Sequence, residues 1–431
     1  MQKTHHRYVY YLKYFGPGAV IACMTIGAGD IVLAPRIGAW AIPFYSALWI
    51  ITFAMITKAL TAYLATRYSL LSGEHIMTLF SRVRPHGWIN ILSLIIGFAL
   101  LPFMIATFLT ILGNVLTLFT GTGDFIIWGV GLGLAIAIFG LLSSYKIIEK
   151  IQLVFVIFLS VGAIIAVAVV HPDWLAMLKG LFTPQIPQVA SWVTAEDITT
   201  VPVMLQLAAI YGTMHGAYAD FTAYISWWRL RVQEKKVELK SEIMTGVKVD
   251  LTVSFLIVAI FMTAFLAAGV VILGKNHLVP NGVDLISQQQ SIYAIISPLV
   301  GNYIYPIAMV GVIAGSIYAG MDATPRMIKA WVDPLSARVQ KISFKRFQLY
   351  ILLYLLFVSV PLMFIQKPII LMTIYLLLTG VFGMWLLGWG ALWANQKQLP
   401  KEQRLGKAKF ALFVLNNIVV TVFIVLIFVY L

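Results

Sequence analysis

Apolar runs of membrane-spanning length recur along the whole chain. A run of about 20 apolar residues can cross the hydrocarbon core of a bilayer as a helix. Eleven such runs lie near 16–41, 44–66, 88–118, 125–143, 147–170, 199–228, 250–274, 302–320, 347–365, 369–393 and 409–430. The pattern predicts an all-α integral membrane protein with about eleven transmembrane helices in a single domain, 1–431.

Two of these runs, the first and the sixth, are interrupted by glycine. The first is interrupted at 16–18 and again at 27–29, with Gly29 in the break, and the sixth at 212–216, with Gly216 in the break. Glycine costs about 1 kcal/mol in a helix interior, and unwound backbone at membrane depth persists only where it is buried or lines a cavity. A matched pair of broken spans is the best sequence indication of a transporter's binding site.

The order of the runs predicts an inverted repeat. Runs one to five (about 15–170) and six to ten (about 199–393) form two groups, each opening with a broken helix. Because five is odd, the second group must be inserted upside down relative to the first. This 5+5 arrangement, with helices 1 and 6 broken and an extra C-terminal helix near 409–430, is the LeuT-type architecture.

Composition and charge agree with this interpretation. The chain is 61% hydrophobic and 11% charged, whereas soluble domains are about 25% charged. Its net charge of +14 could indicate a nucleic-acid partner, but all but five of the 30 Lys and Arg fall in segments on one side if the runs alternate. By the positive-inside rule, we expect a multi-pass protein of a bacterial inner or plasma membrane, without a nucleic-acid partner. Its N-terminus is expected in the cytoplasm and its C-terminus outside.

Acidic residues within membrane spans are costly and usually functional, and Asp30 follows the first break directly. The freed carbonyls of Gly27 and Ala28 would lie beside its carboxylate, and such oxygens suit a hard cation. Alternatively, Asp30 caps the second half-helix or pairs with Arg36. The sequence leaves these possibilities open.

The sixth span offers a different set of groups. Gly212 would present a carbonyl, and the thioether of Met214 would favour a softer transition metal, although buried methionine is often ordinary packing. His215 could be a ligand, a proton acceptor or a gate, or could bond a freed carbonyl. Asp220 lies five residues beyond His215, about 7–8 Å along a helix, where it would line the exit path.

Two further charged positions lie in or near the spans. Asp322 and Arg326, at the inner end of the eighth span, are four residues apart and are expected to pair across one helical turn; a gate or proton-linked role at the inner vestibule is the alternative. Lys58, in the second span, is expected to pair with an acidic residue or to extend to the inner surface.

These features resemble the Nramp divalent-metal transporters. The resemblance rests on the sequence Gly-Pro-Gly at 16–18, the gap of about ten residues to a broken helix, and eleven spans with the N-terminus inside. The similarity covers spans one, two, six and eight. It implies a LeuT-type fold and uptake of manganese, iron and related ions, usually with protons.

The chain departs from that family's motifs. The family's Asp-Pro-Gly-Asn falls on 27–30, which puts Gly27 at the metal-binding aspartate and Asp30 at the asparagine. Its Met-Pro-His falls on 213–215 or on 214–216; on the first alignment the second histidine of the family becomes Asp220. The acidic residue of the third span and the arginines of the ninth, which relay protons in the family, are missing. We therefore do not expect proton coupling by that route.

The main hypothesis is thus a secondary transporter, not an enzyme, that moves a divalent metal cation (Mn/Fe-like or Mg) by alternating access. It needs no cofactor beyond the ion; protons or Na⁺ are possible coupling ions, and the oligomeric state is open. One alternative is a sodium- or proton-coupled carrier of a small organic solute, whose carboxylate would bind the positive ends of the half-helices. A sensor or scaffold that does not transport is another.

An intramembrane aspartyl protease is a remote alternative, since 27–30 matches Gly-x-Gly-Asp. Such enzymes need a second aspartate that shares a proton with the first. The order of the motifs is wrong here, because Gly-x-Gly-Asp precedes the candidate partner Asp220 and position 219 is alanine.

Overall fold

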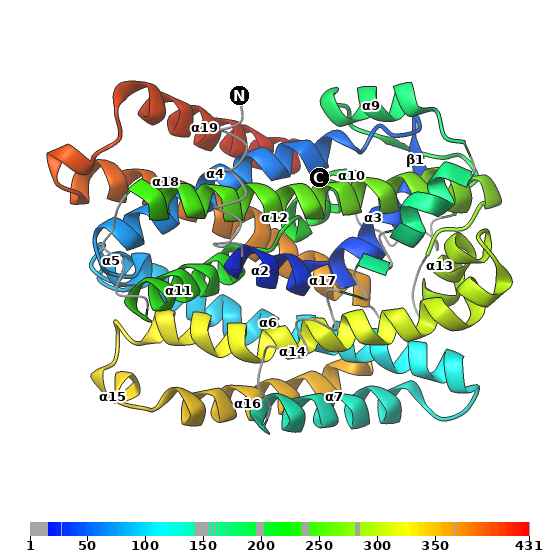
Figure 1. Ribbon diagram of the computed structural model, residues 1–431, viewed down its shortest axis with the longest axis horizontal. Coiled ribbons are helices and arrows are strands. Elements are labelled where there is room, and N and C mark those ends of the chain that lie inside the picture. Colours follow the sequence, from blue (N-terminus) through cyan, green and yellow to red (C-terminus); the bar gives the residue numbers. More distant parts are fainter. Residues whose placement is uncertain are drawn as a thin grey trace, which may run out of the picture.

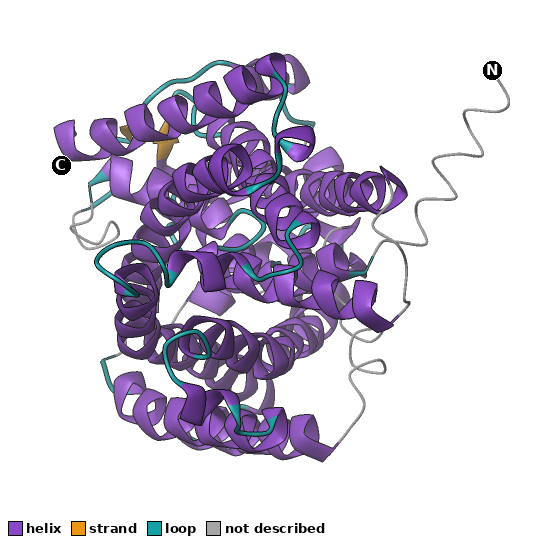
Figure 2. Cartoon of the chain, turned by 90° about the vertical axis from the view of Figure 1, so that its left-hand side faces the viewer, coloured by secondary structure: helices purple, strands orange, loops and turns teal. Residues whose placement is uncertain are grey.

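Long helices run side by side through the whole molecule. The computed structural model describes residues 16–26, 28–142, 154, 157–158, 161–169, 171–194, 202–234, 241–280, 285–365 and 368–430. Figure 1 shows these helices from the side, and Figure 2 looks along many of them. The prediction of an all-helical membrane protein is confirmed.

The helices of the first part of the chain are α2 (Pro17–Thr25), α3 (Ala28–Trp40), α4 (Trp49–Leu71), α5 (Ile76–Phe80), α6 (Trp88–Thr120), α7 (Phe125–Leu142) and α9 (Trp174–Phe182). The second part contains α10 (Val203–Thr213), α11 (Tyr218–Glu234), α12 (Ser241–Ala268), α13 (Leu285–Ala294), α14 (Tyr305–Val332), α15 (Ala337–Gln340), α16 (Phe344–Met363), α17 (Pro368–Leu376), α18 (Gly383–Trp393) and α19 (Lys407–Val429). Two short strands, β1 (Ala41–Ile42) and β2 (Gln188–Val189), pair antiparallel.

Among the described residues, helices lie along ten of the expected spans and along 161–169 of the remaining one. Within the described ranges, seven helical segments are long and apolar enough to cross a membrane, and α2 and α3 form a further span bent by 52°. Most of the fifth expected span, 147–170, lies outside the described residues. The tenth span, 369–393, consists of α17 and α18 joined by a π-helical turn, Leu377–Phe382.

Glycines allow the helix backbones around the two broken spans to approach closely. A Cβ at Gly38 of α3 would lie 2.1 Å from the carbonyl oxygen of Leu266 in α12, and one at Gly269 would lie 2.1 Å from that of Pro35. Small residues are typical of such close helix contacts in membranes. Substitution at these positions would separate α3 from α12.

The outer helices present large apolar side chains outward. Phe357 of α16 is 82% exposed, and Leu415 and Val422 of α19 are more than half exposed. A continuous apolar surface of this kind is unusual on a soluble monomer and is the surface expected to face lipid.

Candidate ion site at the two helix breaks

The sixth span is two helices separated by four residues. α10 ends at Thr213 and α11 begins at Tyr218. Between them His215 (φ +53°) and Gly216 (φ +84°) are in the left-handed region, which glycine adopts freely and other residues adopt only uncommonly. The amide of Gly216 donates to the carbonyl of Thr213 at 3.0 Å, so the chain turns tightly before α11 starts.

The first span also consists of two helices, with the break one or two residues earlier than expected. α2 ends at Thr25 and α3 begins at Ala28. Gly29 therefore lies in the first turn of α3 and not in the break, which corrects the sequence expectation. Gly27 lies outside the described residues, so its carbonyl remains a predicted ligand. Asp30 is in the first turn of α3, a position that acidic residues favour because of the helix dipole.

Asp30 is joined to the sixth span by one hydrogen bond. The Thr213 hydroxyl donates to Oδ1 of Asp30, and the Asp30 side chain is fully buried. Its other oxygen, Oδ2, has no hydrogen-bond partner among the described residues. Arg36, the alternative partner, donates to the carbonyl of Pro280 at 2.7 Å. A buried carboxylate oxygen without a partner is costly, and a bound cation would offset that cost.

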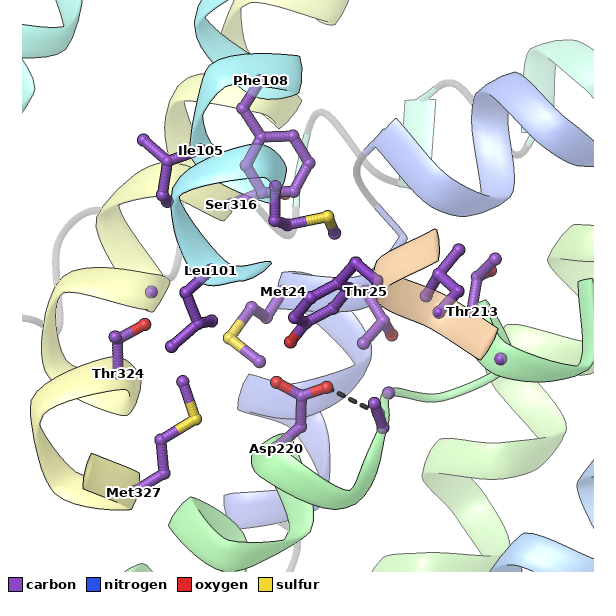
Figure 3. A pocket seen from close by; sticks show the side chains of 17 residues that line it. Met24, Thr25, Leu101, Ile105, Phe108, Thr213, Asp220, Ser316, Thr324 and Met327 are labelled. Carbon is purple, nitrogen blue, oxygen red and sulfur yellow. Dashed lines mark hydrogen bonds between the residues drawn. The ribbon is translucent and has the colours of Figure 1, made fainter. Parts of the chain in front are cut away.

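A small cavity of about 60 Å³ lies between the two breaks. One water needs about 10–15 Å³ of such volume, so the cavity can hold an ion with a few waters. Figure 3 shows the lining side chains, which come from α2, α6, α10, α11, α14 and α17. Its oxygen and sulfur groups come from Met24, Thr25, Met104, Thr213, Asp220, Ser316, Thr324, Met327 and Tyr375.

Asp220 supplies the carboxylate of this cavity. It lies in the first turn of α11, where its Oδ2 accepts the Ala217 amide at 2.6 Å. The other side of the carboxylate faces Met24 and Thr25 across the cavity (Figure 3). A Cβ at Gly216 would lie 2.9 Å from Asp220 Oδ2, so the glycine leaves room for the carboxylate.

The Gly212 carbonyl, an expected metal ligand, already has a donor. Lys58 Nζ of α4 donates to the carbonyl oxygens of Tyr211 at 3.0 Å and Gly212 at 2.9 Å. Lys58 is fully buried, so the expectation that it extends to the inner surface is wrong. Gly212 itself lies within α10, and a Cβ at Gly380 would lie 2.4 Å from its Cα. The glycine pair brings α10 close to the π-helical turn of the tenth span.

Met214 and His215 lie beside the cavity without lining it. Met214 is fully buried, and the residues around the cavity do not include it. The His215 ring stacks on Phe255, with ring centroids 3.9 Å apart, and on Phe221 at 5.9 Å. Neither ring nitrogen has a hydrogen-bond partner in the described part of the chain. Their roles as ligand and gate remain predictions.

The thioethers that do line the cavity come from three other helices. Met24 is on α2, Met104 on α6 and Met327 on α14. Sequence reasoning missed all three. The position of Met24, directly before the first break, was the one available signal; Met104 and Met327 lie in runs whose facing the sequence does not fix.

Asp322 and Arg326 form the pair that their spacing predicts. Arg326 Nε lies 2.6 Å from Oδ2 and Nη2 lies 3.0 Å from Oδ1. The Trp227 indole also donates to Asp322 at 3.0 Å, which joins α11 to α14. Arg326 lines a separate, larger cavity of about 450 Å³ that also contains Arg229. The internal pair is confirmed, and a gating or proton-linked role remains a prediction.

A second buried carboxylate, which the sequence analysis did not single out, holds the start of α2. Asp250 of α12 accepts the amides of Gly16 at 3.0 Å and Gly18 at 2.9 Å. Its Oδ2 also accepts the Tyr224 hydroxyl at 2.9 Å and the Trp228 indole at 3.1 Å. The signal was an acidic residue near the start of an apolar run.

The side chains at the breaks do not form a conventional metal cluster. Among the described residues, no group of three or more His, Cys, Asp or Glu could hold an ion together. A cation here would be bound by one carboxylate with hydroxyl, carbonyl and thioether groups. Such mixed donors suit a cation that is held briefly and released.

Comparison with known proteins identifies the fold and a family match. The model of the family described as natural resistance-associated macrophage protein-like (Nramp) matches residues 18–431. No curated protein matches. A solved structure of the Eremococcus coleocola manganese transporter, in complex with an aromatic bis-isothiourea substituted compound, is 14% identical with a TM-score of 0.71, and the match covers 96% of this chain and 85% of that one.

Two solved transporters of organic molecules share the fold at lower similarity. MhsT in complex with L-phenylalanine is 16% identical with a TM-score of 0.60, over 96% of this chain and 98% of that one. The nucleobase-cation-symport-1 family transporter Mhp1, with bromovinylhydantoin bound, is 12% identical with a TM-score of 0.56, over 92% and 80%. The architecture is therefore that of the LeuT-type transporters.

Proposed function

The chain belongs to the Nramp family, and from this premise we propose that it moves a divalent metal cation through the cavity between its two helix breaks. It is a membrane transporter and not an enzyme. The observation that carries the proposal is the link from Asp30 through the Thr213 hydroxyl to a small cavity that Thr213 and Asp220 line. The sixth span thus places a carboxylate in the cavity, and the carboxylate of the first span is joined to the cavity wall through Thr213.

The donor atoms favour a transition metal over magnesium. Asp220, Thr25 and Thr213 offer oxygen, which hard cations prefer, whereas Met24 and Met327 offer thioethers, which prefer softer ions. Magnesium demands near-ideal octahedral oxygen coordination and keeps several waters. The mixed set supports a manganese- or iron-like cargo, with no cofactor beyond that ion.

The arrangement of the half-helices supports alternating access. The ends of α2 and α10 and the start of α11 line the cavity, so the ion would be held by the ends of half-helices, as in other transporters of this architecture. Rocking of the elements that carry the breaks would open the cavity to one side and then to the other. By the charge distribution, the N-terminus lies in the cytoplasm and the C-terminus outside, in a bacterial inner or plasma membrane.

Proton movement by the family's usual route is not part of this proposal. α6 contains no charged residue, and those of α16, Lys345 and Arg346, lie in its first turn and are exposed. A proton relay within the membrane would need a titratable group on one of these helices.

Ion uptake into proteoliposomes tests the proposal. We expect manganese influx into vesicles that contain the wild-type protein, with magnesium and calcium as competitors and a pH dye inside. Asp220→Asn and Asp30→Asn should each abolish the flux. Asp124→Asn is the matched control, because Asp124 is an exposed aspartate at the start of α7 that caps the Ile126 amide.

Two outcomes would contradict the proposal in different ways. Normal manganese flux in both site variants would show that the ion passes elsewhere. No divalent flux at all, from protein shown to be folded and inserted, would favour a carrier of a small organic solute on the same fold. MhsT and Mhp1, bound to organic molecules, show that the architecture can take such ligands.

A further inference from the structure

Lys58 is a buried cation at the helix break of the sixth span. It lies midway along α4, its side chain is fully buried, and no part of it reaches the surface. Taking an ammonium group out of water is expensive unless polar groups replace the water. The position of this charge therefore needs an explanation that packing does not give.

The explanation lies in the carbonyl groups at the end of α10. The last four carbonyls of a helix lack intrahelical donors. Here Ile210 accepts the Met214 amide at 3.2 Å, and Thr213 accepts the Gly216 amide at 3.0 Å. The remaining two, those of Tyr211 and Gly212, accept Lys58 Nζ at 3.0 and 2.9 Å.

These two carbonyls are the groups that would otherwise attract a cation. Carbonyl oxygens freed by a helix break, together with the negative end of a half-helix, coordinate cations in transporters of this architecture. The ammonium of Lys58 satisfies both oxygens at once and lies 5.4 Å from the centre of the Tyr211 ring. The ammonium group of Lys58 therefore lies where a bound metal ion would otherwise contact these carbonyls.

The charge of the same ammonium is opposite to that of the two aspartates at the breaks. Asp30 and Asp220 both interact with it electrostatically. With both carboxylates ionised, one ammonium reduces the net charge of the group from −2 to −1. A divalent ion in the cavity would be attracted by the carboxylates and repelled by Lys58, and such interactions are strong where water is excluded.

We propose that Lys58 is a resident competitor of the transported cation, holding the carbonyls of the sixth-span break and lowering the affinity of the site for divalent ions. This inference rests on the proposed function. The ammonium keeps the break satisfied while the cavity holds no ion, and it makes binding weak enough for release. Lys58 is thus a residue that sets affinity and charge selectivity without being a ligand.

Neutral substitutions at this position test the inference. Lys58→Gln removes the charge and keeps N–H donors for the two carbonyls, so it should fold even if Lys58→Met does not. We expect both variants to bind manganese about tenfold more tightly or better, because one repelling charge close to a divalent ion is removed. Calorimetry on purified protein at fixed pH and ionic strength measures the dissociation constant.

A matched control separates this local effect from the change in total charge. Lys179→Gln makes the same change at an exposed lysine of α9, far from the breaks in sequence, and should leave the dissociation constant at the wild-type value. Lys58→Arg keeps the charge and should not tighten binding. Tighter manganese binding by Lys58→Gln, with unchanged binding by Lys179→Gln, supports the inference.

The contrary outcomes are distinct. If the wild type binds manganese and folded Lys58→Gln binds it equally well or more weakly, the role of Lys58 is overturned and the proposed function stands. Absence of manganese, magnesium and calcium binding in the wild type and in every variant overturns the proposed function, and this inference with it. Binding that appears only in the neutral variants supports the inference, because it shows that the ammonium blocks the site.

Discussion

Asp250 should hold the N-terminal end of α2 closed against α11 and α12, and its replacement by asparagine should release that end. The carboxylate accepts four donors: two amides at the start of α2, and the Tyr224 hydroxyl and Trp228 indole of α11. One carboxylate on α12 thus joins α2, which precedes the break of the first span, to α11, which follows the break of the sixth span. The negative charge also lies at the positive end of α2.

The size of the effect follows from the hydrogen bonds. In Asp250→Asn the amide nitrogen is itself a donor, so the Gly16 bond at the Oδ1 position is lost, and the three bonds at Oδ2 go to a neutral oxygen. A bond to a charged group contributes about 1.5–3 kcal/mol and a bond between neutral groups about 0.5–1.5 kcal/mol, so the one lost bond and the three weakened bonds together cost about 3 kcal/mol or more. A loss of about 3 kcal/mol would raise the open population about 100-fold.

The chain carries its own reporter of this opening. Cys23 is the single cysteine of the sequence and lies buried in α2. Its rate of modification by a thiol reagent follows the open population when opening and closing are fast. We expect labelling about 100-fold faster in Asp250→Asn than in the wild type, and no labelling in Cys23→Ser.

Tyr224→Phe provides the graded control for this experiment. It removes one donor and leaves the carboxylate bonded to both amides of α2, so labelling should rise by only about tenfold, the effect of one bond at the lower end of that range. Unchanged Cys23 labelling in folded Asp250→Asn would refute the reasoning, because it would show that other contacts hold α2 in place.

Three further predictions concern the break, the inner surface and pH. Gly216→Ala should reduce manganese uptake without loss of insertion, since its φ of +84° is unfavourable for alanine and the Cβ would lie 2.9 Å from Asp220 Oδ2; uptake equal to wild type would contradict this. Arg326→Ala should lower thermal stability by only about 1 kcal/mol, because the pair with Asp322 is partly exposed, and a larger loss in a melting experiment would show a structural role beyond the pair. Burial lowers the pKa of His75, in the loop before α5, from 6.5 to about 4. The folded protein therefore keeps it neutral while the unfolded chain gains a proton below pH 6.5, so stability should be complete above pH 6.5 and fall towards pH 4 by up to about 3 kcal/mol. In His75→Gln the melting temperature should depend less on pH between pH 7 and 5 than in the wild type. An unchanged pH dependence would exclude His75 as its cause.

The spans and the break in the sixth span could be predicted because their causes are local. Apolar length marks a membrane helix, and a cluster of small residues around Gly216 marks the place where the helix stops. The meaning of individual glycines was harder to predict. Gly212 and Gly29 both lie in helices, and Gly212 serves a close approach to Gly380, a partner that no local pattern indicates.

The facing of side chains near the break could not be predicted for a geometric reason. Helical spacing assigns residues to faces only while the helix continues. The left-handed turn at His215 and Gly216 interrupts the helix, so residues before and after it no longer share one helical register. Asp220 therefore lines the cavity while Met214 does not. The contacts of Thr213 with Asp30 and of Lys58 with the end of α10 join residues far apart in the sequence. A single sequence does not reveal such contacts.

The two buried charges that the sequence analysis misread or missed obey one electrostatic rule. Lys58 lies at the C-terminal, negative end of α10, and Asp250 lies at the N-terminal, positive end of α2. Each therefore has the sign that complements the helix dipole.

The helices that carry these charges are equivalent in the expected repeat scheme. α4 is the second helix of the first repeat, and α12 is the second helix of the second repeat. Each charge contacts a half-helix of the opposite repeat, so the two repeats are joined crosswise through the ends of their broken helices. Opening on the α2 side must break the contacts of Asp250, whereas movement of α10 must break those of Lys58. We therefore expect the states of the transporter to differ in these buried hydrogen bonds, and a substitution at either residue to shift the balance in one direction only.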